Sequence, residues 1–178
     1  MFSQDEYLKV LDYAVSAHKE EKDNKNNVDI VHVTSVAMEI INACEKSKLD
    51  EEKANLAISC ALLHNIIDDT KKSYDDLYVD FSDSIANGVE ALSINKSLDT
   101  KQEQLRNSIE MLLEQPYEVQ MVKLADIIIN ISTANMFKNN NDKKAYIKEA
   151  SFILSCLKNS NIYLSNRLEE KIQTYKNL

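Results

Sequence analysis

The residues from 61 to 70 combine an apolar run with side chains that can do chemistry. Within it, His64 contributes an imidazole, Asn65 an amide, and Asp68 and Asp69 two carboxylates. On a helix, His64 and Asp68 would share a face, as would Asn65 and Asp69. That face could bind a metal or supply an acid and a base. The alternative is a polar helix end, with His64 as a hydrogen-bonded core histidine.

A second carboxylate lies in the most apolar part of the chain. Residues 118–134 repeat aliphatic side chains at helical spacing, which predicts a central helix with Asp126 inside it. A carboxylate in such surroundings must be paired, hydrogen-bonded or bound to a cation, because burying it alone is costly or shifts its pKa. Either a structural partner, such as a lysine or a helix terminus, or a bound cation meets this requirement.

The elements that position these residues are expected to be helices. The chain of 178 residues has one glycine and one proline, few of the breakers that an all-β fold requires, and its length suits one domain with a sizeable core. His32 is expected at the start of the second helix, and Ser73 resembles a capping-box residue before a short helix. The other expected helices cover residues 4–20, 34–41, 52–69, 82–92, 100–114, 118–134, 144–157 and 164–175.

Composition and charge exclude several classes of function. A formal charge of −8 argues against a protein that coats a nucleic-acid polymer, because phosphate backbones are bound through clustered lysine and arginine. No apolar run approaches the roughly 20 residues needed to cross a bilayer, and the start of the chain is acidic, unlike a signal peptide. We therefore expect a cytoplasmic protein with three reduced cysteines. A small phosphorylated ligand remains compatible, because local positive charge or a bound cation suffices for it.

Residues 19–27 form a run of nine polar residues without apolar periodicity, which predicts a loop. Such charge runs are usually solvated. The functional alternative is that Lys22 and Lys25 form a lip over a ligand site.

Three separated motifs resemble a known family. His32, the segment 61–70, and the segment 122–130, which reads Val-Lys-Leu-Ala-Asp-Ile-Ile-Ile-Asn, occur in the order typical of the HD-domain phosphohydrolase superfamily, in its RelA/SpoT-type branch. That branch reads His, then Ala-Leu-Leu-His-Asp-x-x-Glu-Asp-Thr, then Lys-Leu-Ala-Asp-Arg-x-x-Asn. The resemblance implies an all-α, single-domain helical bundle of the HD type over residues 1–178, with core motifs in 28–134 and closing helices in 144–178.

The resemblance also implies a site and a reaction. The residues matching its divalent-metal ligands, commonly for manganese, are His32, His64, Asn65 and Asp126. Asp68 and Asp69 match the acidic pair that positions or activates the attacking water, Asn130 matches a nucleotide contact, and Lys22 to Lys25 match a basic segment that packs on the base. The implied reaction is hydrolysis of a nucleotide phosphate or pyrophosphate, such as removal of the 3′-pyrophosphate from (p)ppGpp.

The chain departs from the family pattern at several positions. Asn65 replaces the aspartate of the HD pair, and a neutral amide should weaken metal binding. Ile127 replaces an arginine, Val28 and Asp29 replace a Pro-Tyr pair, and Asp68 replaces a longer glutamate. Two hypotheses follow: a metal-dependent nucleotide phosphohydrolase, which we favour, or a catalytically impaired relative that binds a nucleotide or a protein partner without turnover. A helical scaffold without a small-molecule site would leave the motifs unexplained, and the closing helices leave an oligomer open.

Overall fold

The computed structural model describes residues 1–20, 26–133 and 140–176, with side chains described for all of these except 26–29 and 140–141. The described residues form ten helices and no strand, which confirms the predicted all-α class. The helices are α1 (Gln4–Glu20), α2 (Asn26–Ser47), α3 (Glu51–Leu63), α4 (Ile66–Asp69), α5 (Tyr74–Asp80), α6 (Asp83–Leu92), α7 (Lys101–Leu113), α8 (Tyr117–Ser132), α9 (Asn140–Leu157) and α10 (Ile162–Lys176). None of the described helices is long and apolar enough to cross a membrane.

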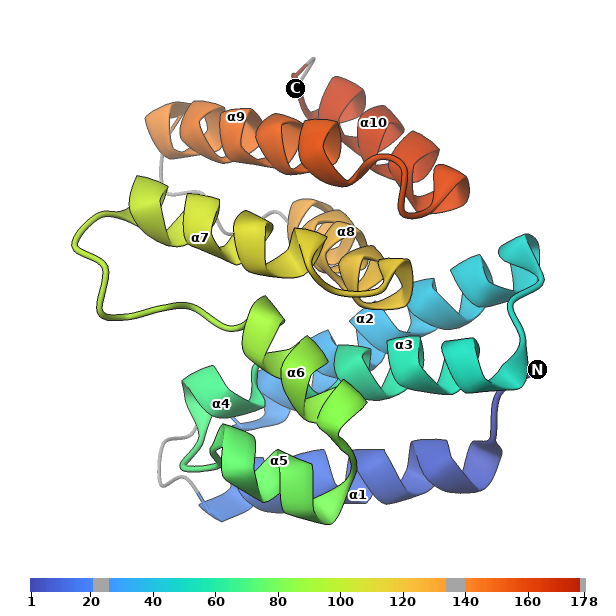
Figure 1. Ribbon diagram of the computed structural model, residues 1–178. Helices are drawn as coiled ribbons and strands as arrows, with labels where there is room; N and C mark the ends of the chain where they lie inside the picture. The colour runs from blue at the N-terminus through green and yellow to red at the C-terminus, as the bar shows by residue number, and fades with distance from the viewer. Residues whose placement is uncertain (21–25, 134–139, 177–178) are drawn as a thin grey trace.

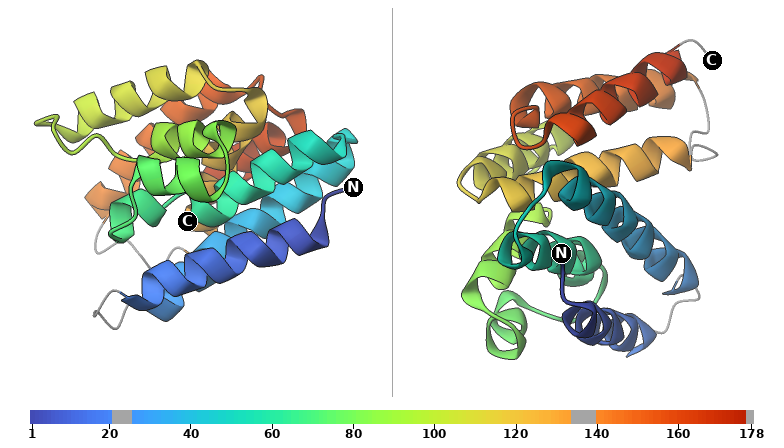
Figure 2. Two further views of the ribbon diagram at one scale, coloured as in Figure 1. Left: turned by 60° about the horizontal axis from the view of Figure 1, so that its bottom comes forward. Right: turned by 90° about the vertical axis from the view of Figure 1, so that its right-hand side faces the viewer.

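Helix α8 is the centre of the bundle. It packs against α2 and α3 on one side and against α9 and α10 on the other, while α1 covers α3 at the far end of the molecule (Figures 1 and 2). Its aliphatic side chains are almost all buried, which agrees with the apolar run in the sequence. Because α8 contacts both halves of the bundle, a polar side chain on it is enclosed by several helices.

Capping residues set the starts of the peripheral helices. The Ser73 and Thr100 side chains each accept a hydrogen bond from the backbone N–H three residues later, and Asp76 and Glu103 bond back to complete two capping boxes. Pro116 precedes the first residue of α8, where its fixed φ and missing N–H cost nothing. The predicted capping box at Ser73 is thus confirmed.

The predicted helix over residues 52–69 is interrupted. The structure divides it into α3 and α4, with His64 and Asn65 between them. Asn65 has φ −101° and ψ −2°, which turns the chain, and its side chain does not cap α4. His64 and Asp68 therefore do not lie on one continuous helix, although both side chains line the same pocket.

Two helices begin at least four residues earlier than predicted. Helix α2 begins at Asn26, so His32 lies in its second turn instead of at its start, and α9 begins at Asn140 instead of at residue 144. Helix α9 begins with the wholly polar run Asn-Asn-Asp-Lys-Lys, and apolar periodicity cannot detect a helix end that is polar on every side. Helix α2 begins Asn-Asn-Val-Asp-Ile, at the end of the polar run that predicted a loop.

Gly88 allows α6 to pack closely on its neighbours. A Cβ atom built at this position would lie 2.7 Å from Cys60 Sγ of α3 and 3.0 Å from Val119 Cγ2 of α8. The structure gives the glycine a packing role, because any side chain there would push α6 away from the core.

Candidate metal centre

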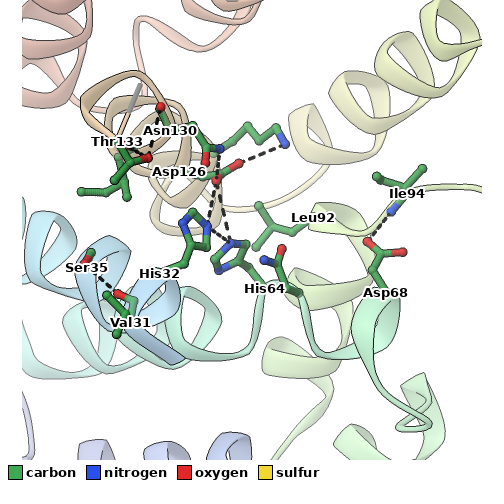
Figure 3. Close-up of a pocket in the computed structure, with 13 residues that line it drawn as sticks. Val31, His32, Ser35, His64, Asp68, Leu92, Ile94, Asp126, Asn130 and Thr133 are labelled. Carbon is green, nitrogen blue, oxygen red and sulfur yellow. Dashed lines mark hydrogen bonds and ion pairs between the residues drawn. The ribbon is translucent and has the colours of Figure 1, made fainter. Parts of the chain in front are cut away.

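Three ligand-type side chains from three segments converge beside α8. His32 comes from α2, His64 directly follows α3, and Asp126 belongs to α8 (Figure 3). His32 Nε2 lies 3.2 Å from Asp126 Oδ1 and 3.2 Å from His64 Nε2, and His64 Nε2 lies 3.9 Å from the same carboxylate oxygen. One ligand atom from each residue falls within 4.8 Å of the others. Residues far apart in sequence thus meet at one point.

The protonation of His64 suits a ligand. Its Nδ1 lies 2.8 Å from the Ala61 carbonyl oxygen, which can only accept, so Nδ1 carries the proton and Nε2 presents a lone pair to the cluster. His64 is 4% exposed, and this burial lowers the pKa of its imidazole against the opposing effect of the Asp126 carboxylate. The ring is therefore held neutral, in one orientation, with Nε2 toward Asp126.

Asp126 is a buried carboxylate that remains ionised. Burial alone would raise its pKa, but the Lys123 ammonium and the two histidines together hold the pKa of Asp126 well below its usual range. Lys123 Nζ lies 3.4 Å from Oδ2, and Asn130 Nδ2 donates to Oδ1 at 2.7 Å. Both carboxylate oxygens are thus engaged, and the charged form required of a metal ligand is the stable one.

The donor set fits a divalent transition metal. Two imidazole nitrogens and one carboxylate oxygen suit manganese or iron, and the His64 hydrogen bond to the backbone supplies the outer-shell orientation typical of metal-binding histidines. Asn65 lies beside His64 in the same pocket, and among the described residues its side-chain amide has no hydrogen-bond partner. The Asn65 amide is therefore not committed to another group among the described residues.

The cluster opens into a pocket of about 530 Å³. Val31 and Ile94, which are 65% and 52% exposed, stand at its rim, so part of its wall is apolar and open to a ligand. The described residues that line it are Val31, His32, Ser35, His64, Asn65, Asp68, Leu92, Ile94, Lys123, Asp126, Ile129, Asn130 and Thr133. The predicted ligands and the predicted nucleotide contact Asn130 therefore share one cavity.

The predicted acidic pair is divided. Asp68 lines the pocket, where its Oδ2 accepts from the Ile94 N–H at 3.0 Å and its Oδ1 lies 3.3 Å from Lys96 Nζ (Figure 3). Asp69 is exposed and is not among the lining residues that the structure describes. The two carboxylates point apart because they are successive residues of α4, and successive side chains of a helix do not share a face.

Some site residues fall outside the prediction or outside the described residues. Lys22 and Lys25 lie outside the described residues. Lys123 and Lys96 each contact a pocket carboxylate and were not predicted. Lys123 stands three residues before Asp126, so the rule that residues three or four apart on a helix are neighbours could have identified it. Lys96 follows another helix, and no local pattern links it to Asp68.

Comparisons with known proteins agree with this geometry. The HD domain family model matches residues 10–159. A Drosophila melanogaster guanosine-3′,5′-bis(diphosphate) 3′-pyrophosphohydrolase, MESH1, is 26% identical over 92% of this chain and 91% of its own length. The Aquifex aeolicus protein of the same activity name is 27% identical over 79% of this chain, which spans only 19% of that relative.

A solved structure gives the same fold. The structure of a metazoan ortholog of SpoT, described as hydrolysing ppGpp, superposes with a TM-score of 0.78 at 23% identity, covering 98% of this chain and 97% of that one. At this identity the likeness is one of fold. With the family model matching most of the chain, the conclusion is that this protein belongs to the HD domain family.

Proposed function

We propose that this chain is a metal-dependent phosphohydrolase that acts on a nucleotide pyrophosphate, with (p)ppGpp as the substrate class. The observation that carries the proposal is the convergence of His32, His64 and Asp126 within 4.8 Å at the wall of an open pocket. Relatives that align with the chain over most of its length carry the name of a guanosine-3′,5′-bis(diphosphate) 3′-pyrophosphohydrolase, which supports the choice of substrate.

His32, His64 and Asp126 would hold a divalent cation, Mn²⁺ in our proposal, with Asn65 as a neutral fourth ligand. When bound, such a cation neutralises phosphoryl charge and makes a water molecule more acidic. His64 is held ready for this role by its hydrogen bond to the Ala61 carbonyl. Asn130 positions the Asp126 carboxylate through a 2.7 Å hydrogen bond and faces the same pocket, where a ligand can reach it.

Asp68 and Asp69 are proposed as the carboxylates that position the attacking water. Asp68 already lines the pocket, and its contacts with the Ile94 N–H and Lys96 fix its orientation. Asp69 would act from outside the described lining, one residue further along α4. Lys22 and Lys25 are proposed to contact the base of the nucleotide.

The alternative function is nucleotide binding without turnover. Two features favour it: the fourth ligand, Asn65, carries no charge, and the carboxylate of Asp68 is held by Lys96 instead of being free to accept a proton. The alternative predicts that a nucleotide binds equally well with and without a chelator. The hydrolase predicts that chelation abolishes the reaction.

The test is an assay of pyrophosphate release from ppGpp by the full chain with Mn²⁺ and with a chelator. The native chain, Asn65→Asp and Asp126→Asn are compared. Release by the native chain that requires Mn²⁺ and is lost in Asp126→Asn supports the hydrolase. Release only by Asn65→Asp would show that the native chain is impaired at that position. If neither the native chain nor Asn65→Asp releases pyrophosphate, the proposed activity is overturned.

A further inference from the structure

Lys123 competes for the carboxylate that the proposed cation needs. It stands one helical turn before Asp126 on α8, and its Nζ lies 3.4 Å from Asp126 Oδ2. The other contacts, from His32, His64 and Asn130, go to Oδ1. The Lys123 side chain is 20% exposed and lines the same pocket. A cation held by Asp126 would therefore stand close to a fixed positive charge.

The charges around the pocket cancel. Asp68 and Asp126 are the acidic residues of its described lining, and each is paired with one lysine, Lys96 and Lys123 respectively. Asn65 adds no charge, although the chain as a whole carries −8. A site without net negative charge gives a bare divalent cation little Coulomb attraction, because hard cations are held chiefly by anionic oxygen.

We propose that Lys123 makes this site select a cation that arrives bound to a pyrophosphate group over the bare cation. Pyrophosphate oxygens supply the negative charge that the pocket lacks. The long, flexible lysine side chain can turn from Asp126 to a phosphoryl oxygen, which frees Oδ2 and pairs both charges. The cation and the anion then strengthen each other's binding, as linkage requires. The inference rests on the proposed function for the identity of the cation site, but it does not require turnover.

The test measures binding by calorimetry, using MnCl₂ alone and a preformed one-to-one complex of Mn²⁺ with inorganic pyrophosphate. The native chain is expected to bind the complex more tightly than free Mn²⁺. In Lys123→Met, affinity for free Mn²⁺ should rise and affinity for the complex should fall, each by roughly tenfold, the ratio that corresponds to about 1.4 kcal/mol. The ratio of the two affinities, which favours the complex in the native chain, should thereby fall by roughly a hundredfold.

Two control variants separate charge from structure. Lys123→Arg keeps the positive charge and should retain the native preference. Lys101→Met removes the same charge from an exposed position on α7 and should leave both affinities unchanged. Thermal unfolding establishes that each variant is folded, and a misfolded Lys123→Met is replaced by Lys123→Gln.

The outcomes distinguish this inference from the proposed function. Weaker binding of both Mn²⁺ forms in Lys123→Met would show that Lys123 merely orients Asp126, and would overturn the inference. Equal affinities in Lys123→Met and the native chain would do the same, while the cation site itself would stand. Failure of both proteins to bind Mn²⁺ in either form would overturn the proposed function together with the inference.

Discussion

Two buried carboxylates, Glu39 of α2 and Asp126 of α8, are stabilised in different ways. Glu39 is 3% exposed and receives two hydrogen bonds from one guanidinium, Arg167 Nε at 2.7 Å and Nη2 at 2.6 Å. Asp126 is surrounded by two imidazoles at 3.2 and 3.9 Å, a lysine at 3.4 Å and an amide at 2.7 Å. The first arrangement is a closed ion pair that joins α2 to α10, and the second gathers two imidazole nitrogens and a carboxylate oxygen beside an open pocket.

The difference shows what distinguishes a carboxylate that only stabilises the fold from one that can bind a ligand. A fork of two parallel N–H bonds matches a carboxylate completely and leaves nothing for a ligand. The partners of Asp126 come from three segments, and its histidine and lysine nitrogens lie 3.2 to 3.9 Å from the carboxylate oxygens. Because a pocket also borders the cluster, there is room for an ion. Burial alone does not distinguish the two residues.

The largest expected effect is on catalysis at Asp126. Asp126→Asn keeps the size of the side chain and an oxygen for Asn130 but removes the charged ligand. We expect kcat/KM for ppGpp hydrolysis to fall about a thousandfold or more, equivalent to roughly 4 kcal/mol of transition-state stabilisation. Unfolding in urea should change little by comparison. A variant that retains native hydrolysis would remove Asp126 from the site.

The second-largest expected effect is on stability, from breaking the ion pair between Glu39 and Arg167. Arg167→Ala leaves Glu39 buried without its partner, and we expect a loss of roughly 2–3 kcal/mol in the free energy of unfolding, less than a fully buried pair because Arg167 is 36% exposed. Urea denaturation measures this loss. Mn²⁺ affinity should not change, so a parallel loss of metal binding would mean that the two carboxylates are not independent.

A smaller effect is expected from restoring the missing acid. Asn65→Asp adds an anionic oxygen beside His64 and should raise Mn²⁺ affinity by roughly tenfold, about 1.4 kcal/mol. The matched control is Asn130→Asp, which adds the same charge but loses the hydrogen bond to Asp126. If Asn65→Asp binds Mn²⁺ no better than the native chain, position 65 does not face the cation.

The smallest expected effect is the pH dependence of stability. The folded state lowers the pKa of His64 below 6.5, so below that pH the unfolded chain binds more protons and the folded state loses stability. Between pH 7.5 and 5.5 we expect a loss of about 1 kcal/mol from this residue. Urea denaturation of the native chain and of His64→Asn at both pH values isolates the contribution of His64 to this loss of stability. The Glu39–Arg167 pair raises the pKa of Arg167 and keeps its charge in this range. An identical pH slope in the variant would refute the assignment to His64.

The sequence predicts most of the fold. Apolar periodicity and capping residues locate α1, α6 and α7 to within a residue or two, because these helices have a clear buried face and marked ends, and the long apolar run after Pro116 locates α8 equally well. The break at Asn65 is missed because apolar residues continue through it, and the polar start of α9 gives no periodic signal.

The site is less accessible to sequence reasoning. The resemblance to the family identified His32, His64 and Asp126 as one set of ligands, and the structure brings these three residues to one point. Glu39 lies in a less apolar stretch and was not singled out, and no local pattern links it to its partner Arg167, 128 residues away. The Lys96 contact with Asp68 is likewise tertiary, so only a folded structure shows that the acidic pair is divided.

The metal site is tested most directly by calorimetric titration of Mn²⁺ into the native chain, Asp126→Asn and Glu39→Gln. Both variants replace a buried carboxylate with the matching amide. We expect the native chain and Glu39→Gln to bind Mn²⁺ with the same affinity, while Asp126→Asn loses affinity by at least about a hundredfold. Equal binding by Asp126→Asn and the native chain would contradict the central claim that the convergence of His32, His64 and Asp126 forms a metal site.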